Sequence, residues 1–172
     1  EYNQVMSTPA VVQLNDDNGD GIIDNRDIAD VVVITFKNGD YSRGIVRALS
    51  GVDGSELWDY SQGVIKADST YSPAAADFDG DGIVEIVVAS RWPNESGNSI
   101  ISVIDNQGVV KKQIAKANAS DRETVGNIDI ADINNDGSLE FTLGNAVYNY
   151  DTGVLFEVNA GWSPSSIMFD SN

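Results

Sequence analysis

Residues 77–85 have the sequence DFDGDGIVE, and a run of strand-forming residues follows them directly. Because acids stand at the first, third and fifth positions, three carboxylates face the inside of one tight turn. The sixth position must bend sharply, which glycine permits, and the seventh offers its backbone carbonyl. Hard oxygen ligands at flexible spacing suit Ca²⁺ better than Mg²⁺, which requires a stricter octahedron. The predicted calcium ligands are Asp77, Asp79, Asp81, Ile83 and Glu85.

Two further loops have the same spacing. Residues 132–140 read DINNDGSLE, which predicts the ligands Asp132, Asn134, Asp136, Ser138 and Glu140. The asparagine at the third position replaces one charge by a neutral carbonyl, so we expect weaker binding there. Residues 16–24 read DDNGDGIID, and the short pattern predicts Asp16, Asn18, Asp20, Ile22 and Asp24. Three copies, each with glycine sixth and an acid ninth, predict up to three Ca²⁺ ions.

The closure of the first loop has alternatives, because strand-forming residues begin only after Asp30. Over twelve positions the segment fits the calcium loop of helix–loop–helix proteins. Asp27 is then the bidentate closing ligand, and Asp24 binds directly or through water. Alternatively, Asp30 closes the loop from the start of the next strand, as Glu85 does in residues 77–85. Gln13 and Asn15 then take the places that Asp77 and Asp79 have there.

The loops belong to a repeat. Their first acids stand 61 and 55 residues apart, and a tight turn with Gly54, Gly108 or Gly153 follows each loop. Such turns are typical of β-hairpins, and the runs between the landmarks are rich in strand-forming residues without a helical period. The expected strands are Pro9–Leu14, Val31–Phe36, Ile45–Leu49 and Ser55–Tyr60, then Pro73–Phe78, Glu85–Ser90, Ser99–Asp105 and Val109–Ala115, then Asn127–Ile133, Glu140–Gly144, Ala146–Tyr150 and Val154–Val158.

Four short strands per unit are typical of β-propeller blades. We therefore expect an all-β chain of about three four-stranded antiparallel blades, part of a larger, for example seven-bladed, ring. A β-sandwich with acidic turns is the alternative, but it gives no reason for the same loop in every unit. Open edges invite aggregation, so the remaining blades would come from the same longer chain or from another copy. The partial propeller is expected over residues 1–172, with blades at about 8–60, 72–115 and 126–159 and the start of a fourth at 163–172.

Composition limits the partners. Asp and Glu number 27 against 10 Lys and Arg, a net charge of −17 that repels nucleic acid and anionic membranes. No apolar run is long enough to be inserted across a membrane. Cysteine and histidine are absent, which excludes disulfides, thiolate sites and the preferred zinc ligand. Because 12 of the 27 acids lie in residues 16–27, 77–85 and 132–140, the charge is concentrated where cations would bind.

The loops and the strands after them, residues 77–88 and 132–143, resemble FG-GAP/VCBS repeats, the calcium-binding blades also found in integrin-type propellers. Residues 14–36 resemble a variant of bacterial secreted FG-GAP proteins. The resemblance implies Ca²⁺ in the hairpin between the first two strands of each blade; the family includes adhesins, receptors and polysaccharide-degrading enzymes. The short last hairpin of the third unit departs from the family pattern. Residues 48–58 are similar to the tryptophan-docking segment of quinoprotein propellers, but only one unit has it, which favours a packing role for Trp58.

These observations favour a non-catalytic, extracellular or cell-surface module of a bacterial protein, with structural Ca²⁺ and with loops for ligand binding or adhesion. The ligand would be a glycan or a protein, because loops opposite the calcium carry aromatic and cationic side chains. These are Tyr41, Arg43, Tyr60, Tyr71, Arg91, Trp92, Lys116 and Arg122. The alternative is the propeller portion of a secreted carbohydrate-active enzyme such as a polysaccharide lyase. A quinoprotein-type oxidoreductase is the third reading. We predict no catalytic residue.

Overall fold

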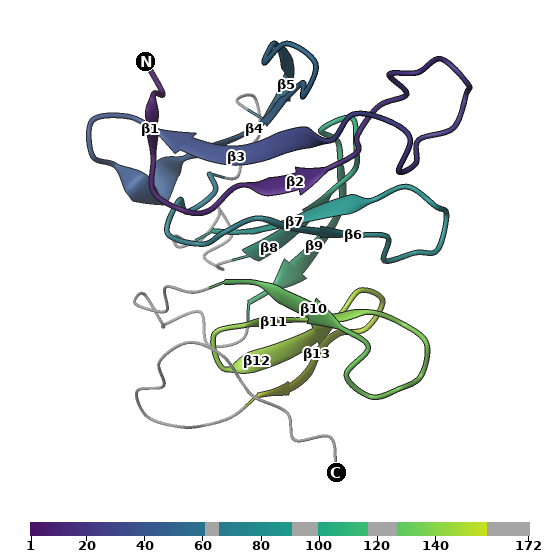
Figure 1. Ribbon diagram of the computed structural model, residues 1–172. Coiled ribbons are helices and arrows are strands. Elements are labelled where there is room, and N and C mark those ends of the chain that lie inside the picture. Colours follow the sequence, from purple (N-terminus) through teal and green to yellow (C-terminus); the bar gives the residue numbers. More distant parts are fainter. Residues whose placement is uncertain (61–65, 91–99, 117–126, 158–172) are drawn as a thin grey trace.

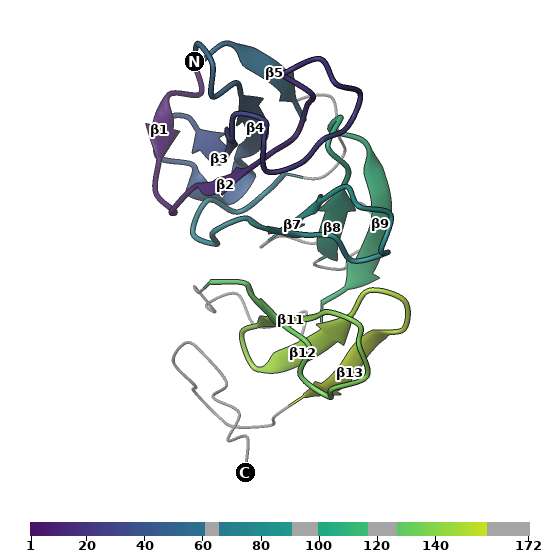
Figure 2. The ribbon, with the colours of Figure 1, turned by 45° about the vertical axis from the view of Figure 1, so that its right-hand side comes forward.

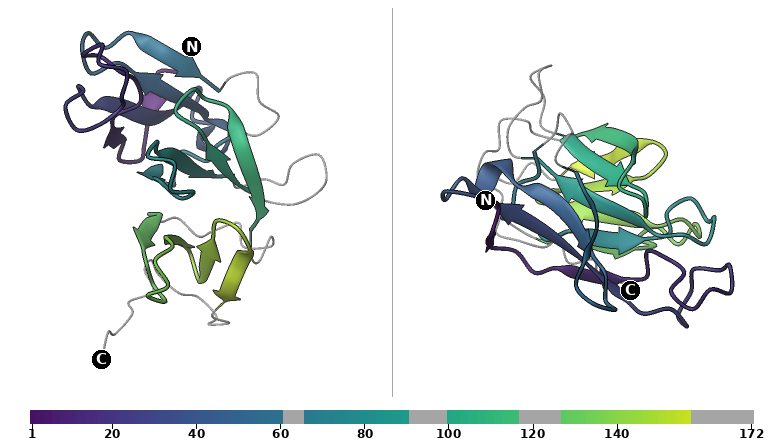
Figure 3. Two further views of the ribbon diagram at one scale, coloured as in Figure 1. Left: turned by 90° about the vertical axis from the view of Figure 1, so that its right-hand side faces the viewer. Right: turned by 90° about the horizontal axis from the view of Figure 1, so that it is seen from above.

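The computed structural model describes residues 1–60, 66–90, 100–116 and 127–157, and these form three antiparallel β-sheets. The sheets follow one another along the chain and are stacked, with the N-terminal sheet at the top in Figure 1. The turned views in Figure 2 and in the left panel of Figure 3 keep the same order, and the right panel of Figure 3 looks down on the first sheet. The expected opening of a fourth blade at 163–172 lies outside the described residues.

In each sheet neighbouring strands pair antiparallel, and from β2 onward successive strands of a sheet are neighbours. The first sheet has the order β1-β3-β4-β5, with β2 also paired to β3, and consists of β1 (Gln4–Val5), β2 (Ala10–Val12), β3 (Asp30–Phe36), β4 (Ile45–Leu49) and β5 (Glu56–Asp59). The second consists of β6 (Ala74–Ala76), β7 (Glu85–Ala89), β8 (Ile100–Ile104) and β9 (Val110–Ala115). The third consists of β10 (Asp129–Ala131), β11 (Glu140–Leu143), β12 (Ala146–Asn149) and β13 (Gly153–Glu157).

The all-β prediction of three antiparallel units is confirmed, and every predicted strand is present within its unit. Two elements were not predicted. β1 adds a fifth strand to the first sheet, and a short 3₁₀ helix occupies Tyr41–Arg43 between β3 and β4. The arrangement is that of propeller blades, and closure into a larger ring stays a prediction.

The second sheet is buried on both faces. Successive side chains of a strand point to opposite sides, and along β7 Ile86 and Val88 pack in a core shared with the first sheet. Val87 and Ala89 pack in a core shared with the third sheet. The uninterrupted apolar run of β7 is explained by this position between two neighbours.

Aromatic side chains fill the junction between the second and third sheets. The Phe141 ring stacks on that of Tyr148 with their centroids 5.3 Å apart, and it meets Phe78 edge-on at 5.8 Å. Phe78 also stacks on Tyr150 at 6.1 Å. Phe78 is the second residue of the middle acidic loop, so this loop is anchored directly to the core between the sheets.

The outer strands at the two ends of the stack expose apolar side chains. On the first sheet and next to it these are Val5, Met6 and Val11, and on β13 they are Val154, Leu155 and Phe156. Apolar surface of this kind is suited to contact with a neighbouring element. Within the described ranges, no helix has the length and hydrophobicity that crossing a membrane requires.

Candidate metal centre

The three acidic loops connect β2 to β3, β6 to β7 and β10 to β11. All three project from the same side of the stack, on the right in Figure 1. In the second and third sheets the loop therefore lies between the first two strands, where the sequence places it. In the first sheet it lies between β2 and β3, because β1 is an additional strand.

The first acid of each loop holds the turn by accepting backbone hydrogen bonds. Asp77 accepts from the N–H groups of Gly80 at 2.7 Å and Asp81 at 3.1 Å with Oδ1, and from Gly82 at 2.9 Å with Oδ2. The first acids of the other two loops accept from the residues four and five places further on in the same way. The chain is thereby wrapped around one carboxylate in all three loops.

The third and fifth positions repeat a second set of bonds. Asp79 Oδ1 accepts from the N–H of Asp81 at 3.3 Å, and Asp81 Oδ1 accepts from the N–H of Ile83 at 2.8 Å. The other two loops have the same pair of bonds. Side-chain acceptors two residues before a backbone donor are Asx turns, which place the carboxylates on the inside of the loop.

The bend at the sixth position has the left-handed conformation that glycine favours. The φ angles are +87° at Gly21, +87° at Gly82 and +89° at Gly137. The fourth position is also left-handed, and in the third loop it is Asn135 with φ +58°. Asparagine tolerates this region better than other non-glycine residues, so the third loop keeps the same backbone path without a second glycine.

Three carboxylates converge in the second loop. One oxygen each from Asp77, Asp79 and Glu85 lies within 4.8 Å of the others. Glu85 is the first residue of β7 and only 1% exposed, and its Oε2 accepts from the N–H of Phe78 at 2.9 Å. A buried carboxylate needs donors or a cation to compensate its lost hydration. The structure therefore contains an acidic cluster that could hold a metal ion.

An ammonium group from β9 shows where a cation fits. Lys111 Nζ lies 2.5 Å from Asp79 Oδ2, 2.8 Å from Glu85 Oε1 and 3.8 Å from Asp81 Oδ2. The oxygens thus face one common positive charge, and a donor set of carboxylates suits a hard divalent ion. The hydrogen bond to Lys111 lowers the pKa of Asp79, and the same contact raises the pKa of Lys111.

The third loop is completed by an amide. Glu140 begins β11 and is fully buried, and its Oε2 accepts from the N–H of Ile133 at 3.0 Å, as in the second loop. Its Oε1 accepts from Asn149 Nδ2 at 3.0 Å. The backbone N–H of Ser138 lowers the pKa of Asp136. The loop therefore repeats the backbone geometry of the second loop, with a neutral donor in place of an ammonium group.

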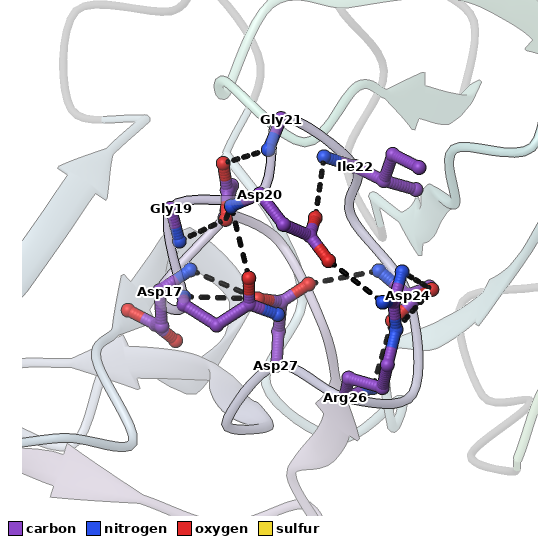
Figure 4. Close-up of polar contacts among 10 residues, drawn as sticks. Asp17, Gly19, Asp20, Gly21, Ile22, Asp24, Arg26 and Asp27 are labelled. Carbon is purple, nitrogen blue, oxygen red and sulfur yellow. Dashed lines mark hydrogen bonds and ion pairs between the residues drawn. The ribbon is translucent and has the colours of Figure 1, made fainter.

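In the first loop, Asp27 points inward and closes the turn (Figure 4). It is 6% exposed, and its Oδ1 accepts from the N–H groups of Asp17 at 3.0 Å and Asn18 at 3.3 Å. Its Oδ2 accepts from the N–H of Asp24 at 2.9 Å. Asp27 thus joins the two ends of the twelve-residue loop through backbone hydrogen bonds.

Asp24 faces an arginine instead of the other acids. Arg26 Nη2 lies 2.7 Å from Asp24 Oδ2, and Arg26 Nη1 lies 2.9 Å from Asp20 Oδ2. The hydrogen bonds from Arg26 lower the pKa of Asp24. Within the part of the chain that the structure describes, no three acids of this loop bring their oxygens as close together as those of the second loop.

Asp30 has the strand position of Glu85. Asp30 pairs with Val12, the last residue of β2, just as Glu85 pairs with the last residue of β6. Its Oδ2 accepts from the N–H of Leu14 at 3.0 Å, the same tie that Glu85 makes. Its Oδ1 accepts from the N–H of Gly51 at 3.0 Å. Both oxygens of this buried carboxylate are therefore used by the backbone.

The structure thus places the predicted side chains of each loop around one turn. Among the described residues, three carboxylates lie close together only in the second loop. Metal binding by the individual predicted ligands stays a prediction. Sequence reasoning missed the contacts of Lys111, Arg26 and Asn149. No local sequence pattern indicates the contacts of Lys111. They depend on the pairing of β8 with β9, in which Val103 pairs with Lys112 and the next residue pairs with Val110, so that Lys111 is skipped.

A cavity of about 340 Å³ is lined mainly by residues of the connection between β3 and β4. In Figure 1 this connection lies on the opposite side of the stack from the acidic loops. Three of the ten basic residues of the chain line it. Lys37 Nζ lies 4.7 Å from the centroid of the Tyr2 ring, which forms one wall. The lining residues are Tyr2, Lys37, Asn38, Asp40, Arg43 and Lys66.

Two of the residues that we expected to contact a ligand are buried, so that expectation is wrong for them. Lys116 Nζ lies 2.9 Å from the Tyr71 hydroxyl and 4.9 Å from the centroid of its ring, and both residues are almost inaccessible. Tyr60 packs against the core between the first and second sheets. Three further residues that we expected to contact a ligand lie outside the described residues: Arg91, Trp92 and Arg122.

Trp58 links the first sheet to the second. Its Nε1 donates to the backbone carbonyl of Asn106 at 2.8 Å, and Asn106 Nδ2 donates to the carbonyl of Leu14 at 3.0 Å. Gly108 lies against the indole ring so closely that a Cβ atom there would meet ring atoms at 2.9 Å. The tryptophan therefore has the packing role that its single occurrence favours.

Comparison with known proteins agrees with this geometry. Residues 77–142, which contain the second and third loops, match the FG-GAP-like repeat. No curated protein matches the chain. The crystal structure of the V. cholerae biofilm matrix protein Bap1 matches with a TM-score of 0.86 and 54% sequence identity, over 100% of this chain and 27% of that chain. The chain thus spans about a quarter of the length of this relative. The second and third acidic loops and the strands after them, within residues 77–142, therefore belong to FG-GAP-like repeats.

Proposed function

We propose that the chain is a calcium-stabilised β-propeller module of an exported or cell-surface bacterial protein, which presents loops for binding a glycan or a protein. The convergence of one carboxylate oxygen each from Asp77, Asp79 and Glu85 carries this proposal. The similarity to Bap1, a biofilm matrix protein, supports a location outside the cell.

Calcium would act on the fold and not on a substrate. In the second loop it would be held by Asp77, Asp79, Asp81, Glu85 and the carbonyl of Ile83, where it would neutralise carboxylates that the turn draws together. Glu85 begins a central strand, so an ion bound there ties the hairpin to the core. An ion that binds only the folded chain stabilises it by mass action. The other two loops would bind calcium through the residues predicted for them.

Thermal unfolding with calcium and with EGTA tests the proposal. At about 100 times the dissociation constant, one bound ion adds about 2.7 kcal/mol to the free energy of unfolding. For a domain of this size, each kcal/mol raises Tm by about 2–4 °C, so we expect a rise of about 5–10 °C. Asp79→Asn should reduce the rise, whereas the exposed Asp53→Asn should leave it unchanged. An equal Tm in calcium and EGTA would refute calcium binding.

The ligand surface is best supported on the side opposite the acidic loops. There, the cavity lined by Lys37, Arg43 and Lys66 gathers positive charge on an otherwise strongly acidic chain, beside the ring of Tyr2. Cationic groups next to an aromatic ring suit a sugar that carries a carboxylate. A glycan array that includes uronic-acid polysaccharides, probed with the wild type and with Lys37→Ala/Arg43→Ala, tests this. Equal binding by both proteins would locate the ligand elsewhere.

We also propose that further blades complete the ring, either from the same longer chain or from another copy. The exposed apolar side chains at the two ends of the stack, Val5, Met6 and Val11 at one end and those of β13 at the other, support this. So does the fact that the chain covers 27% of the Bap1 chain. The expected blade limits of about 8–60, 72–115 and 126–159 are part of this proposal.

A further inference from the structure

The position of Lys111 distinguishes the second sheet from the other two. In each sheet the register between the last two strands shifts at one place. One residue of the last strand is skipped there and faces no residue of the neighbouring strand in the register. In β9 this residue is Lys111, between Val110 and Lys112. The corresponding residues are Leu57 in β5 and Leu155 in β13. Only the second sheet therefore has a cation at this position.

The contacts of Lys111 are with the acids of its own metal loop. Its Nζ lies within 2.8 Å of oxygens of both Asp79 and Glu85, and Glu85 is almost completely buried. The ammonium group therefore compensates a buried carboxylate that would otherwise lie beside two further acids. In the third loop the corresponding oxygen of Glu140 accepts a hydrogen bond from the neutral amide of Asn149.

We propose that Lys111 is a built-in competitor for the metal ion of the second loop: its ammonium group holds the loop acids when calcium is scarce and must leave when calcium binds. This proposal rests on the proposed calcium binding of the loop. It makes the second loop bind calcium more weakly than the charge of its four carboxylates alone indicates.

Competition follows from the shared oxygens. Calcium lies about 2.3–2.6 Å from its ligand oxygens. An ion bound to the same oxygens of Asp79 and Glu85 would lie a few ångströms from the ammonium group, where two positive charges repel strongly. The side chain of Lys111 is 27% exposed, and its flexible four-carbon stem can carry the ammonium group into the solvent. Binding is then an exchange of one cation for another.

The third loop provides the contrast. In the described part of the chain, no lysine or arginine forms an ion pair with Asp132, Asp136 or Glu140. Calcium would therefore enter the third loop without displacing a cation. The first loop has its own cation, since Arg26 pairs with two of its acids.

The test compares Lys111→Met with Lys112→Met. Methionine keeps most of the stem and removes the charge, and Lys112 is a matched control because its Nζ donates to the carbonyl of Asp151, away from the loop acids. Calcium binding is measured by titration calorimetry, and Tm is measured in EGTA. We expect Lys111→Met to raise the affinity of one site by about tenfold or more and to lower Tm in EGTA. Lys112→Met should leave the affinity unchanged.

Leu155→Lys is the reciprocal variant, which installs the same residue type at the corresponding position of the third sheet. Because Leu155 is partly exposed, the substitution should be tolerated, and we expect it to weaken calcium binding at the third loop. In Lys111→Met, an additional Asp79→Asn change should cancel the gain. An unchanged or weaker calcium affinity in Lys111→Met would overturn the competitor role while leaving calcium binding intact. Absence of any calcium binding in the wild type and in both lysine variants would instead refute the proposed function.

Discussion

The substitution Gly108→Ala adds one methyl group at the contact between the first and second sheets and so tests this contact. Gly108 lies in the turn between β8 and β9 with φ +83°, and a Cβ atom there would approach Cδ2 of Trp58 to 2.9 Å. The ring cannot easily move aside, because its Nε1 donates to the carbonyl of Asn106. Gly54 is a matched control, since it has φ +76° in the corresponding turn of the first sheet and no atom within 4 Å of a Cβ.

The expected losses of unfolding free energy differ between the two variants. An L-residue in the left-handed region costs about 1–2 kcal/mol, and both Gly54→Ala and Gly108→Ala incur this cost. Gly108→Ala adds the overpacking against the indole ring, about 1–3 kcal/mol. We therefore expect a loss of unfolding free energy of about 1–2 kcal/mol for Gly54→Ala and about 2–5 kcal/mol for Gly108→Ala.

Urea unfolding followed by far-UV circular dichroism, in a fixed excess of calcium, measures both losses. The same pair is then made in a Trp58→Leu background, where the ring is absent and the two glycine variants should lose similar amounts. Equal losses in the wild-type background, or an unchanged difference after Trp58→Leu, would refute the role of the indole as the contact that Gly108 must accommodate.

Two further variants address the acids. Asp30→Asn should lower the free energy of unfolding by about 1–3 kcal/mol, because asparagine has one acceptor oxygen for the two N–H groups of Leu14 and Gly51. Urea titration checks this against the exposed Asp53→Asn, and similar losses for both would contradict it. The lowered pKa of Asp79 means that its contribution to stability is present above the ordinary aspartate pKa of about 3.9 and is lost as the pH falls through the lower folded value. In calcium-free buffer, stability below about pH 4 should therefore fall more steeply in the wild type than in Lys111→Met, and parallel curves would show that Lys111 is not the cause.

The strands could be predicted from the sequence because each acidic loop and each glycine turn marks an element boundary. β1 could not, since Gln4 and Val5 are both exposed and two residues show no alternation. The twelve-residue reading of the first loop agrees with the inward position of Asp27, and the alternative with Asp30 agrees with its pairing to Val12. Local spacing supported both, and only the sheet shows that the two acids have different roles.

The cross-strand contacts were the part of the site that sequence could not show. Lys111 is distant in sequence from the acids it meets, and its direction depends on the irregular pairing of β8 and β9. The burial of Tyr71 and Lys116 was also missed, because each lies beside a loop in the sequence. In the structure Tyr71 packs in the core between the second and third sheets, and Lys116 donates to its hydroxyl. Contacts between distant strands follow from register, which composition does not specify.

Since the second sheet gives one face to each neighbour, the chain is a linear array in which every unit depends on the next one. Substitutions at alternate positions of β7 then test the two junctions separately. Truncating Ile86 loosens the junction with the first sheet, and truncating Val87 loosens the junction with the third. The slowest amide hydrogen exchange should be found in β7 and β8, because their opening requires both junctions to separate.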